Sequence, residues 1–488
     1  MTPPLKTLSL DVGWQTCDAS AACVGITCRP YDRCLAHLTP AELEEVLAGL
    51  APGRGVDLRG TTLAEELLDR VLSATGRHLG RARFDRAQFT GPARFAEVVF
   101  AGDASFDHAR FDRLASFFGT RFTRNASFRE VRFSREFSMH GARLRGHGAF
   151  DRVRIGSDAL FGDARFGRDA SFRGAEFHGF AAFDGAVFDN DALFRGSRFR
   201  RAVSFRKAAF GGTAGFEGAG FHGGAYLTGL RAGRRLVLSG VHASAPVELE
   251  AAGCPVDLRG ARLSSRLTAR LSDVDLELRE AVLSGPATVT GAAGGLRVLS
   301  LDRLDAGALT LRGADLSGCR LAQVRHPEAL RLSECVFAGT PRGVRVALNW
   351  PPVLWWSERR VLADERAWRG WSARPEQPLD PGRLAGLYER LRRAVDDKKV
   401  AADFAFGAME MRRLATRRRR VRLALAAYWL ACGYGLRMGR AFGWLVVAAA
   451  VAAGALFWTA GAHPARRPVG HRSPAPAPVV HATATGVG

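Results

Sequence analysis

The order of apolar and polar residues between positions 81 and 230 follows a period of 11 residues. Two interleaved series of phenylalanines, which begin at Phe84 and Phe89, contain 23 of the 31 phenylalanines in the chain. Their alternating steps of five and six residues would scatter the rings around an α-helix, and a step of five reverses the face of a flat strand. The pattern therefore predicts a coil that turns a corner every five or six residues and points each ring inward, with four sides in about 22 residues.

Short motifs surround these rings, such as A-S-F-R-G-A-E-F at residues 170–177 and A-D-L-S-G-C-R-L at residues 314–321. They resemble the pentapeptide-repeat family, whose unit is A-(D/N)-L-x-x with an apolar central residue. The resemblance implies a mainly β fold, a right-handed quadrilateral β-helix. The six-residue steps depart from the strict five-residue repeat, and we expect turn-forming residues in the additional position. These residues are Asp103, Asn125, Asp158, Asp169 and Asp191.

The repeat continues in leucine and valine from residue 231 to residue 340, but it loses its register. Fragments such as V-D-L-R-G-A-R-L at residues 256–263 keep the five-residue step. We therefore predict one β-helix over residues 81–340, regular over 81–230 and degraded over 231–340. An independent β-domain over the second segment is the alternative.

Residues 39–80 are predicted to form a helical cap. A capping box at residues 39–42, with proline at the first helical position, predicts a helix that ends near Gly49. Residues 62–65 repeat the signature before a second helix, and residues 56–63 resemble one isolated repeat. We expect the helices to cover the first coil of the β-helix, because an exposed strand edge invites aggregation.

Four cysteines and a histidine lie in a leader at residues 1–38. The first ten residues contain no apolar segment typical of an export signal, so we expect the cysteines to stay reduced. Clustered thiols in a reducing compartment indicate zinc, although these spacings match no standard zinc finger. Unliganded thiols in a flexible leader are the alternative. The predicted ligands of a structural zinc are Cys17, Cys23, Cys34 and His37, with Cys28 as a substitute.

Beyond the repeats, residues 341–422 are predicted to form a tryptophan-rich linker and a helical juxtamembrane region. The helical pattern runs from Pro381 to about Leu414, with a break near Asp396. This stretch is similar to the juxtamembrane segment of membrane-bound pentapeptide-repeat proteins. We expect its aromatic residues to pack in the core of a small helical hairpin.

The 22 uncharged residues at positions 441–462 predict a transmembrane helix. At 1.5 Å per residue they extend about 33 Å, enough to cross a bilayer core of about 30 Å. Trp444 and Trp458 lie near its ends, where interfacial anchors are expected. Residues 423–440 are predicted to be an amphipathic interfacial segment, and residues 463–488 a disordered tail. A buried helix of a soluble protein is the alternative for 441–462.

The net charge of +22 comes largely from arginine, and its distribution predicts an orientation. Nine arginines and no acidic residue lie between Met411 and Arg440, against three arginines after the apolar segment. The positive-inside rule then places the β-helix in the cytoplasm and the tail outside. We expect the arginine cluster at residues 412–422 to contact anionic lipid headgroups.

The chain contains no glycine-rich phosphate loop, no G-x-S-x-G and no H-E-x-x-H motif, so we predict a protein without catalytic activity. The predicted function is a membrane-anchored scaffold whose β-helix binds another protein. Some pentapeptide-repeat proteins mimic DNA and bind gyrase, but residues 81–230 contain 24 basic and 16 acidic residues, a net charge of the wrong sign. Direct nucleic-acid binding is a further alternative, although arginines that alternate with acids make a mixed surface.

Overall fold

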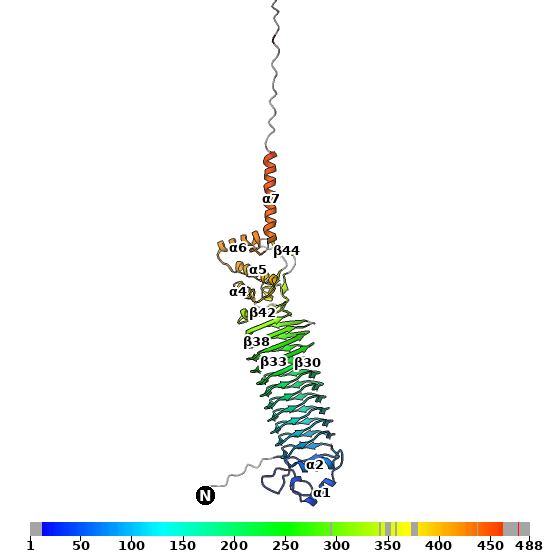
Figure 1. Cartoon of the computed structure of the whole chain (residues 1–488). Helices are drawn as coiled ribbons and strands as arrows, with labels where there is room; N and C mark the ends of the chain where they lie inside the picture. Colours follow the sequence, from blue (N-terminus) through cyan, green and yellow to red (C-terminus); the bar gives the residue numbers. More distant parts are fainter. Residues whose placement is uncertain are drawn as a thin grey trace, which may run out of the picture. The chain divides into compact units, whose positions relative to one another are not determined.

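The computed structural model describes residues 12–292, 295–340, 343–346, 353–356, 359–371, 379–436, 438–461 and 477. The chain divides into two compact units, Met1–Arg417 and Arg418–Gly488. The first unit contains a stack of short parallel strands, a β-solenoid, with helices before and after it (Figure 1). The predicted disordered tail lies outside the described residues except for Ala477, and so does Trp350 of the predicted linker.

Each regular coil has four sides, and each side carries a two-residue strand. Strands on the same side pair in parallel one coil apart, so that Ala82 of β4 (Ala82–Arg83) faces Ala104 of β8 (Ala104–Ser105). The other sides begin with β5 (Gln88–Phe89), β6 (Ala93–Arg94) and β7 (Val99–Phe100). One side forms a 13-stranded sheet from β1 to β41, so the solenoid has about 13 coils. The predicted coil of about 22 residues is confirmed over the regular region.

Stacked phenylalanine rings fill the inside of these coils. Phe84 and Phe106, one coil apart on the same side, have ring centroids 4.9 Å apart and planes at 6°. Rings on opposite sides meet edge to face, as Phe84 and Phe95 do at 5.7 Å and 75°. Each fully buried ring stabilises the fold by roughly 1.5–3 kcal/mol, and aromatic contacts of these two kinds add to it. Phenylalanine suits these positions because a tyrosine hydroxyl would need a partner in the dry interior.

The polar residues at the six-residue corners link one coil to the next. Asp103 Oδ1 accepts a hydrogen bond from the backbone N–H of Asn125 at 3.2 Å, and Asn125 Oδ1 accepts one from His147 at 3.0 Å. Asp191 Oδ1 accepts from the N–H of Thr213 at 2.7 Å in the same way. These side chains therefore bond backbone groups at the corners, where the strand pairing is interrupted.

Residues 231–340 continue the same solenoid, as predicted, and the alternative of an independent domain is wrong. β31 (Arg235–Val237) and β34 (Val256–Asp257) extend the 13-stranded sheet. Leu236 pairs with Val256, so this coil has 20 residues, and later coils vary because Leu296 pairs with Ala314. The register is lost because corners disappear: β30 (Ala225–Ala232) pairs with strands on two different sides and runs through the corner between them.

The first coil contains a helix in place of one strand. β1 (Val56–Asp57) and β2 (Thr62–Leu63) pair with β4 and β5, and β3 (His78–Leu79) pairs with β7. Between β2 and β3, α2 (Glu65–Ala74) takes the position of the third side and contacts β6. Residues 56–63 are therefore part of the first coil.

The two predicted capping boxes have different outcomes. α1 (Pro40–Ala48) begins after Thr39, whose side chain and that of Glu42 form the predicted capping box, and Gly49 ends the helix. The prediction of a second capping box at residues 62–65 is wrong, because Thr62 belongs to β2 and the N-cap of α2 is Ala64. Pairing with β5 holds Thr62 in an extended strand, away from the helix terminus.

Three helices close the other end of the first unit: α3 (Ala363–Trp368), α4 (Pro381–Leu391) and α5 (Lys398–Ala415). The break between α4 and α5 lies where it is predicted, and Val395 in this break pairs with Leu332 of β42 (Leu330–Ser333). The rings of Tyr388 and Phe404 pack at 5.4 Å in the core, as expected for a helical hairpin.

Part of the predicted linker is strand. β43 (Ala338–Gly339) pairs with β46 (Arg360–Val361), and β44 (Gly343–Val346) pairs with β45 (Val353–Trp356), both antiparallel. The tryptophans at positions 355 and 356 therefore belong to a strand.

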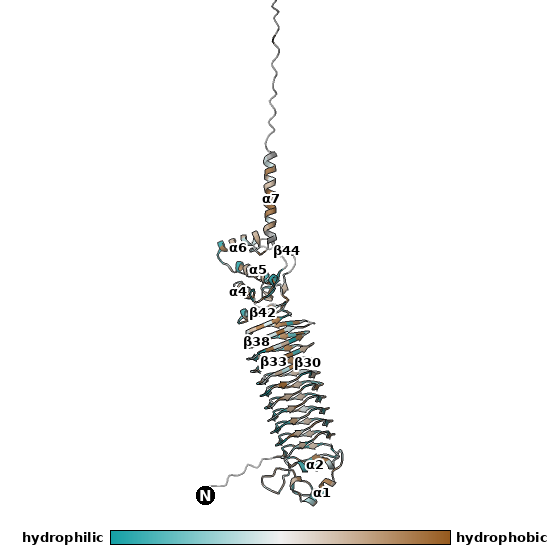
Figure 2. Ribbon diagram, viewed as in Figure 1, coloured by the Kyte–Doolittle hydropathy of each residue, from teal (hydrophilic) through white to brown (hydrophobic). Residues whose placement is uncertain are grey.

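The second unit contains α6 (Arg419–Cys432) and α7 (Met438–Gly461). Segment Ala441–Thr459 of α7 is long and apolar enough to cross a membrane, judged by length and composition, and none of it is buried (Figure 2). Trp444 Nε1 donates a hydrogen bond to the backbone carbonyl of Leu430 in α6 at 2.9 Å. The interfacial position of α6 stays a prediction.

Candidate metal centre

The leader packs against the first coil of the solenoid. The N–H of Ile26 donates to the carbonyl of Arg59 at 2.8 Å, and Ile26 also bridges Thr16 in antiparallel fashion. A side chain at Gly60, which has a φ of +64°, would come within 2.2 Å of the carbonyl oxygen of Val24. This glycine allows the backbone of the leader to lie directly on the coil.

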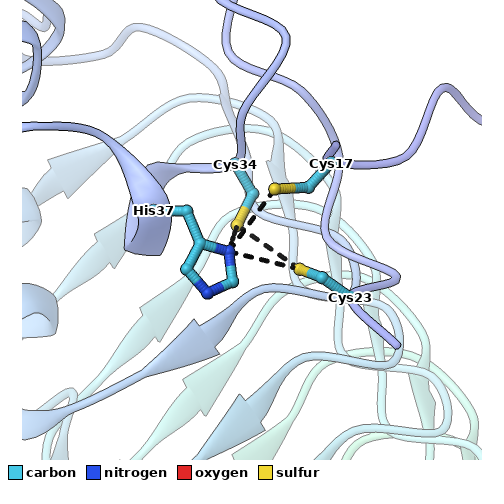
Figure 3. A group of neighbouring side chains, drawn as sticks. All are labelled: Cys17, Cys23, Cys34 and His37. Carbon is cyan, nitrogen blue, oxygen red and sulfur yellow. Dashed lines mark hydrogen bonds between the residues drawn. The ribbon is translucent and has the colours of Figure 1, made fainter. Parts of the chain in front are cut away.

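All four predicted zinc ligands meet in this leader. The sulfur atoms of Cys17, Cys23 and Cys34 and a nitrogen of His37 lie within 4.8 Å of one another (Figure 3). His37 Nδ1 is 3.4 Å from Cys17 Sγ, 3.5 Å from Cys23 Sγ and 3.4 Å from Cys34 Sγ. Cys23 Sγ and Cys34 Sγ are 3.8 Å apart.

These separations match the edges of a tetrahedral site. Zinc–sulfur bonds of about 2.3 Å and zinc–nitrogen bonds of about 2.0–2.1 Å imply sulfur–nitrogen edges of about 3.6 Å and sulfur–sulfur edges of about 3.8 Å. The four distances given above lie within about 0.2 Å of these values. The arrangement can hold one tetrahedral metal ion with only small movements of the side chains.

Local structure aims the ligands at one point. Cys34 directly precedes the short 3₁₀ helix η1 (Leu35–His37), which brings the side chains of Cys34 and His37 together one turn apart. Gly25 lies against Cys34, and a side chain there would stand 2.7 Å from the Cβ of Cys34. The glycine is therefore required for the close approach of Cys34 to Cys23.

The four thiols of the leader differ in acidity. Burial opposes ionisation of Cys17, but hydrogen bonds from the backbone at Cys34 and Ala19 and from His37 lower its pKa to about 7. Burial raises the pKa of Cys23 and of Cys34 above the ordinary thiol value. A bound cation would favour the thiolate of all three, because metal coordination deprotonates a thiol.

Cys28 lies outside this cluster. Its side chain is half-buried and packs against the hydrophobic core, and burial raises its pKa to about 11. The predicted substitute ligand therefore has a packing environment, which makes it a suitable control for experiments on the other three thiols.

Comparison with known families decides what the solenoid is. Residues 78–121 and 183–231 match a family model described as pentapeptide repeats (9 copies). The chain is a pentapeptide-repeat protein. No curated protein and no solved structure gives a significant match. Both matched segments lie in or beside the regular coils, where the phenylalanine period is strict.

The pentapeptide-repeat protein also has a buried cluster of charged residues that sequence reasoning missed. Glu365, which has no exposed surface, pairs with Arg359 and with Arg369, and the hydroxyl of Tyr388 donates to its second oxygen. Burial opposes ionisation of Glu365, but the two guanidinium groups outweigh it and hold its pKa below the ordinary value. Only the spacing of Glu365 and Arg369, four residues apart on a helix, signalled one of these pairs.

Proposed function

We propose that this pentapeptide-repeat protein is a non-catalytic, membrane-anchored scaffold whose solenoid binds an acidic segment of another protein. The observation that carries the proposal is a row of exposed arginines on one side of the solenoid. Arg121 of β11 (Arg121–Phe122) faces Arg143 of β15 (Arg143–Leu144), which faces Arg165 of β19 (Arg165–Phe166). Neighbouring coils hold these side chains about 4.8 Å apart.

The charges of this row are largely uncompensated. Arg165 pairs with Asp189 at 3.1 Å, whereas Arg121 and Arg143 form no ion pair among the described residues. Like charges directly opposite each other on neighbouring strands are unfavourable. Acidic side chains of a partner, laid along the row, would relieve this repulsion and gain charge-assisted hydrogen bonds.

Another side of the solenoid has a comparable row with acids among its arginines. Arg110 and Arg132 face each other there, but Glu176 continues the same row and pairs with Arg154 and Arg198. This mixed row has less reason to attract an acidic partner. It offers a matched control in which the same residue type changes on a different side.

A charge-reversal experiment tests the surface. Arg121→Glu together with Arg143→Glu is expected to abolish recovery of cross-linked acidic partners from membranes, while Arg110→Glu with Arg132→Glu retains them. Equal recovery with both double variants would contradict the proposal. Salt-sensitive retention of the protein on DNA that only the first double variant loses would favour nucleic-acid binding.

Membrane anchoring is the second part of the proposal. α7 exposes large apolar side chains, with Phe457 at 84% and Trp458 at 80% of their surface, and α6 exposes Leu423 at 58%. Such surfaces need a nonpolar environment, and a bilayer supplies one. The charge asymmetry supports a cytoplasmic solenoid.

One detail of the predicted headgroup contact is corrected. Arg413, within the arginine cluster at 412–422, is buried and pairs with Glu410 at 3.1 Å. We propose that the exposed arginines of the cluster contact anionic headgroups. These are Arg412, Arg417, Arg418, Arg419, Arg420 and Arg422.

Fractionation and protease protection test the anchor. The wild-type chain is expected in the membrane fraction, released only by detergent, with the solenoid digested from the cytoplasmic side. Val447→Arg with Val451→Arg should move it to the soluble fraction, because each arginine at a helix centre costs about 2.5–3.5 kcal/mol on insertion. A wild-type chain recovered without detergent would contradict anchoring.

A further inference from the structure

We propose that Cys17, Cys23, Cys34 and His37 bind one Zn²⁺ ion, and that this ion fastens the leader to the first coil of the solenoid. Three thiolates and one imidazole make four protein ligands, which is the composition of a closed structural site with no position open for chemistry. The inference concerns the stability of the N-terminal end and is independent of the proposed scaffold function.

The ligand set favours zinc among the common metals. Soft thiolate ligands exclude magnesium and calcium, which prefer oxygen, and a tetrahedral site of mixed sulfur and nitrogen suits zinc. Cys17 and Cys34 are buried, while His37 is exposed at the edge of the cluster. The ion can therefore reach its ligands from solvent, and the site is closed once the imidazole binds.

The leader needs such a cross-link because its own core is small. Among described residues before position 39, only Cys17, Cys34 and Leu35 are buried apolar side chains. A segment with so little buried surface does not hold a fold by packing alone, and small folds of this kind depend on disulfides or metals. A metal bound by these four residues would join the start of the leader to its end.

The cross-linked segment is the one that touches the first coil. The N–H of Ile26, between the ligands Cys23 and Cys34, donates to Arg59, and the guanidinium of Arg59 lies 4.8 Å from the ring of Trp14. The hydroxyl of Tyr31, between the same two ligands, donates to Glu45 of α1 at 2.7 Å. Ordering the leader by a metal would therefore preserve its contacts with both the coil and α1.

A disulfide between Cys23 and Cys34 is the competing chemistry. Their sulfur atoms are 3.8 Å apart, whereas a disulfide requires about 2.05 Å. Forming it would remove two ligands and leave Cys17 and His37 unable to complete a tetrahedral site. Mass spectrometry of the untreated protein distinguishes the two states.

Metal analysis of the full chain in detergent is the first test. One zinc per chain is expected for the wild type and for Cys28→Ser, and none for Cys34→Ser. Cobalt added to the metal-free wild type should give the visible absorption of a tetrahedral cobalt–thiolate site, so the proposal remains testable if Cys34→Ser misfolds. No cobalt spectrum, a Cys23–Cys34 disulfide, or equal loss of zinc in Cys28→Ser would overturn it.

Gly25→Ala provides a second test that removes no ligand. Because the added methyl group would stand 2.7 Å from the Cβ of Cys34, it should displace this ligand. Zinc affinity is expected to fall roughly 10–100-fold, as for other changes that disturb ligand orientation, and the cobalt spectrum should shift. An unchanged affinity and spectrum would show that Cys34 does not bind in the observed position.

Discussion

At the first coil of the solenoid, three thiols and an imidazole gather in a leader that contains few buried apolar residues. At the last coils, the helices α3 to α5 bury Glu365 between Arg359 and Arg369, close to the packed rings of Tyr388 and Phe404. Both segments cover strands that would otherwise be open at an end of the stack, a feature that repeat proteins must protect.

The difference between the ends follows from the amount of chain available. The C-terminal end has three helices and can surround an ion pair with packed side chains, so the charges are desolvated and must be matched. Asp364 also accepts a hydrogen bond from the N–H of Leu321 at 2.9 Å, which ties the helices to the solenoid. The N-terminal leader is too short to bury charges, and we infer that a metal replaces the missing core.

The largest expected effect is the loss of zinc. Binding free energies of structural zinc in small peptides are about 10–16 kcal/mol, and much of this energy drives folding. Chelation, or Cys17→Ser, should therefore unfold residues 12–38 and make them sensitive to protease, while residues 359–415 stay resistant. Protease cleavage that begins at the C-terminal helices after chelation would contradict the assignment of the metal to the other end.

A smaller loss is expected from Glu365→Gln. Removing this carboxylate leaves Arg359 and Arg369 buried with reduced compensation, which typically costs about 3–5 kcal/mol. Amide hydrogen exchange in α3 to α5 should accelerate, whereas the exposed pair of Glu389 and Arg392 provides a control, Glu389→Gln, with little effect. Slow exchange in Glu365→Gln would show that the buried pair does not hold this end.

The pH dependence of the same end has a definite sign. Because the folded pKa of Glu365 is lowered, its contribution is complete above the unfolded value of about 4.3 and disappears as the pH falls through the folded pKa. The wild type should lose stability in acid more steeply than Glu365→Gln. Parallel acid denaturation curves for the two proteins would exclude this contribution.

A modest effect is expected at a corner between the two ends. Asp191→Ala removes the acceptor for the N–H of Thr213 and should cost roughly 1 kcal/mol. Exchange of the Thr213 amide should increase without any change at either cap. An unaltered Thr213 amide would mean that the corner residues form the turn but do not stabilise the stack.

The smallest effect is expected on the surface. Arg121→Glu should change stability by less than about 0.5 kcal/mol, because its side chain is exposed and its charge is uncompensated. A thermal melt with an unchanged midpoint is the expected result. A large destabilisation would mean that the arginine row serves the fold and not a partner.

The features that sequence predicts well are those encoded by local spacing. Phe84 and its successors define the coil without any distant contact, and residues 17–37 are close enough in the chain for their thiols to be grouped by inspection. The predictions failed where distant partners decide. Thr62 joins a strand because β5 lies beside it, and Arg359 meets Glu365 only after the helices have packed on the last coil.

Hydrogen exchange of the full chain with and without zinc tests most directly whether the two ends are closed by different chemistry. The N–H of Ile26 bonds to Arg59 at the first coil, and the N–H of Leu332 bonds to Ala394 at the last coils. Removal of zinc is predicted to accelerate exchange of the Ile26 amide and to leave the Leu332 amide protected. Equal acceleration at both amides, or none at Ile26, would contradict the account.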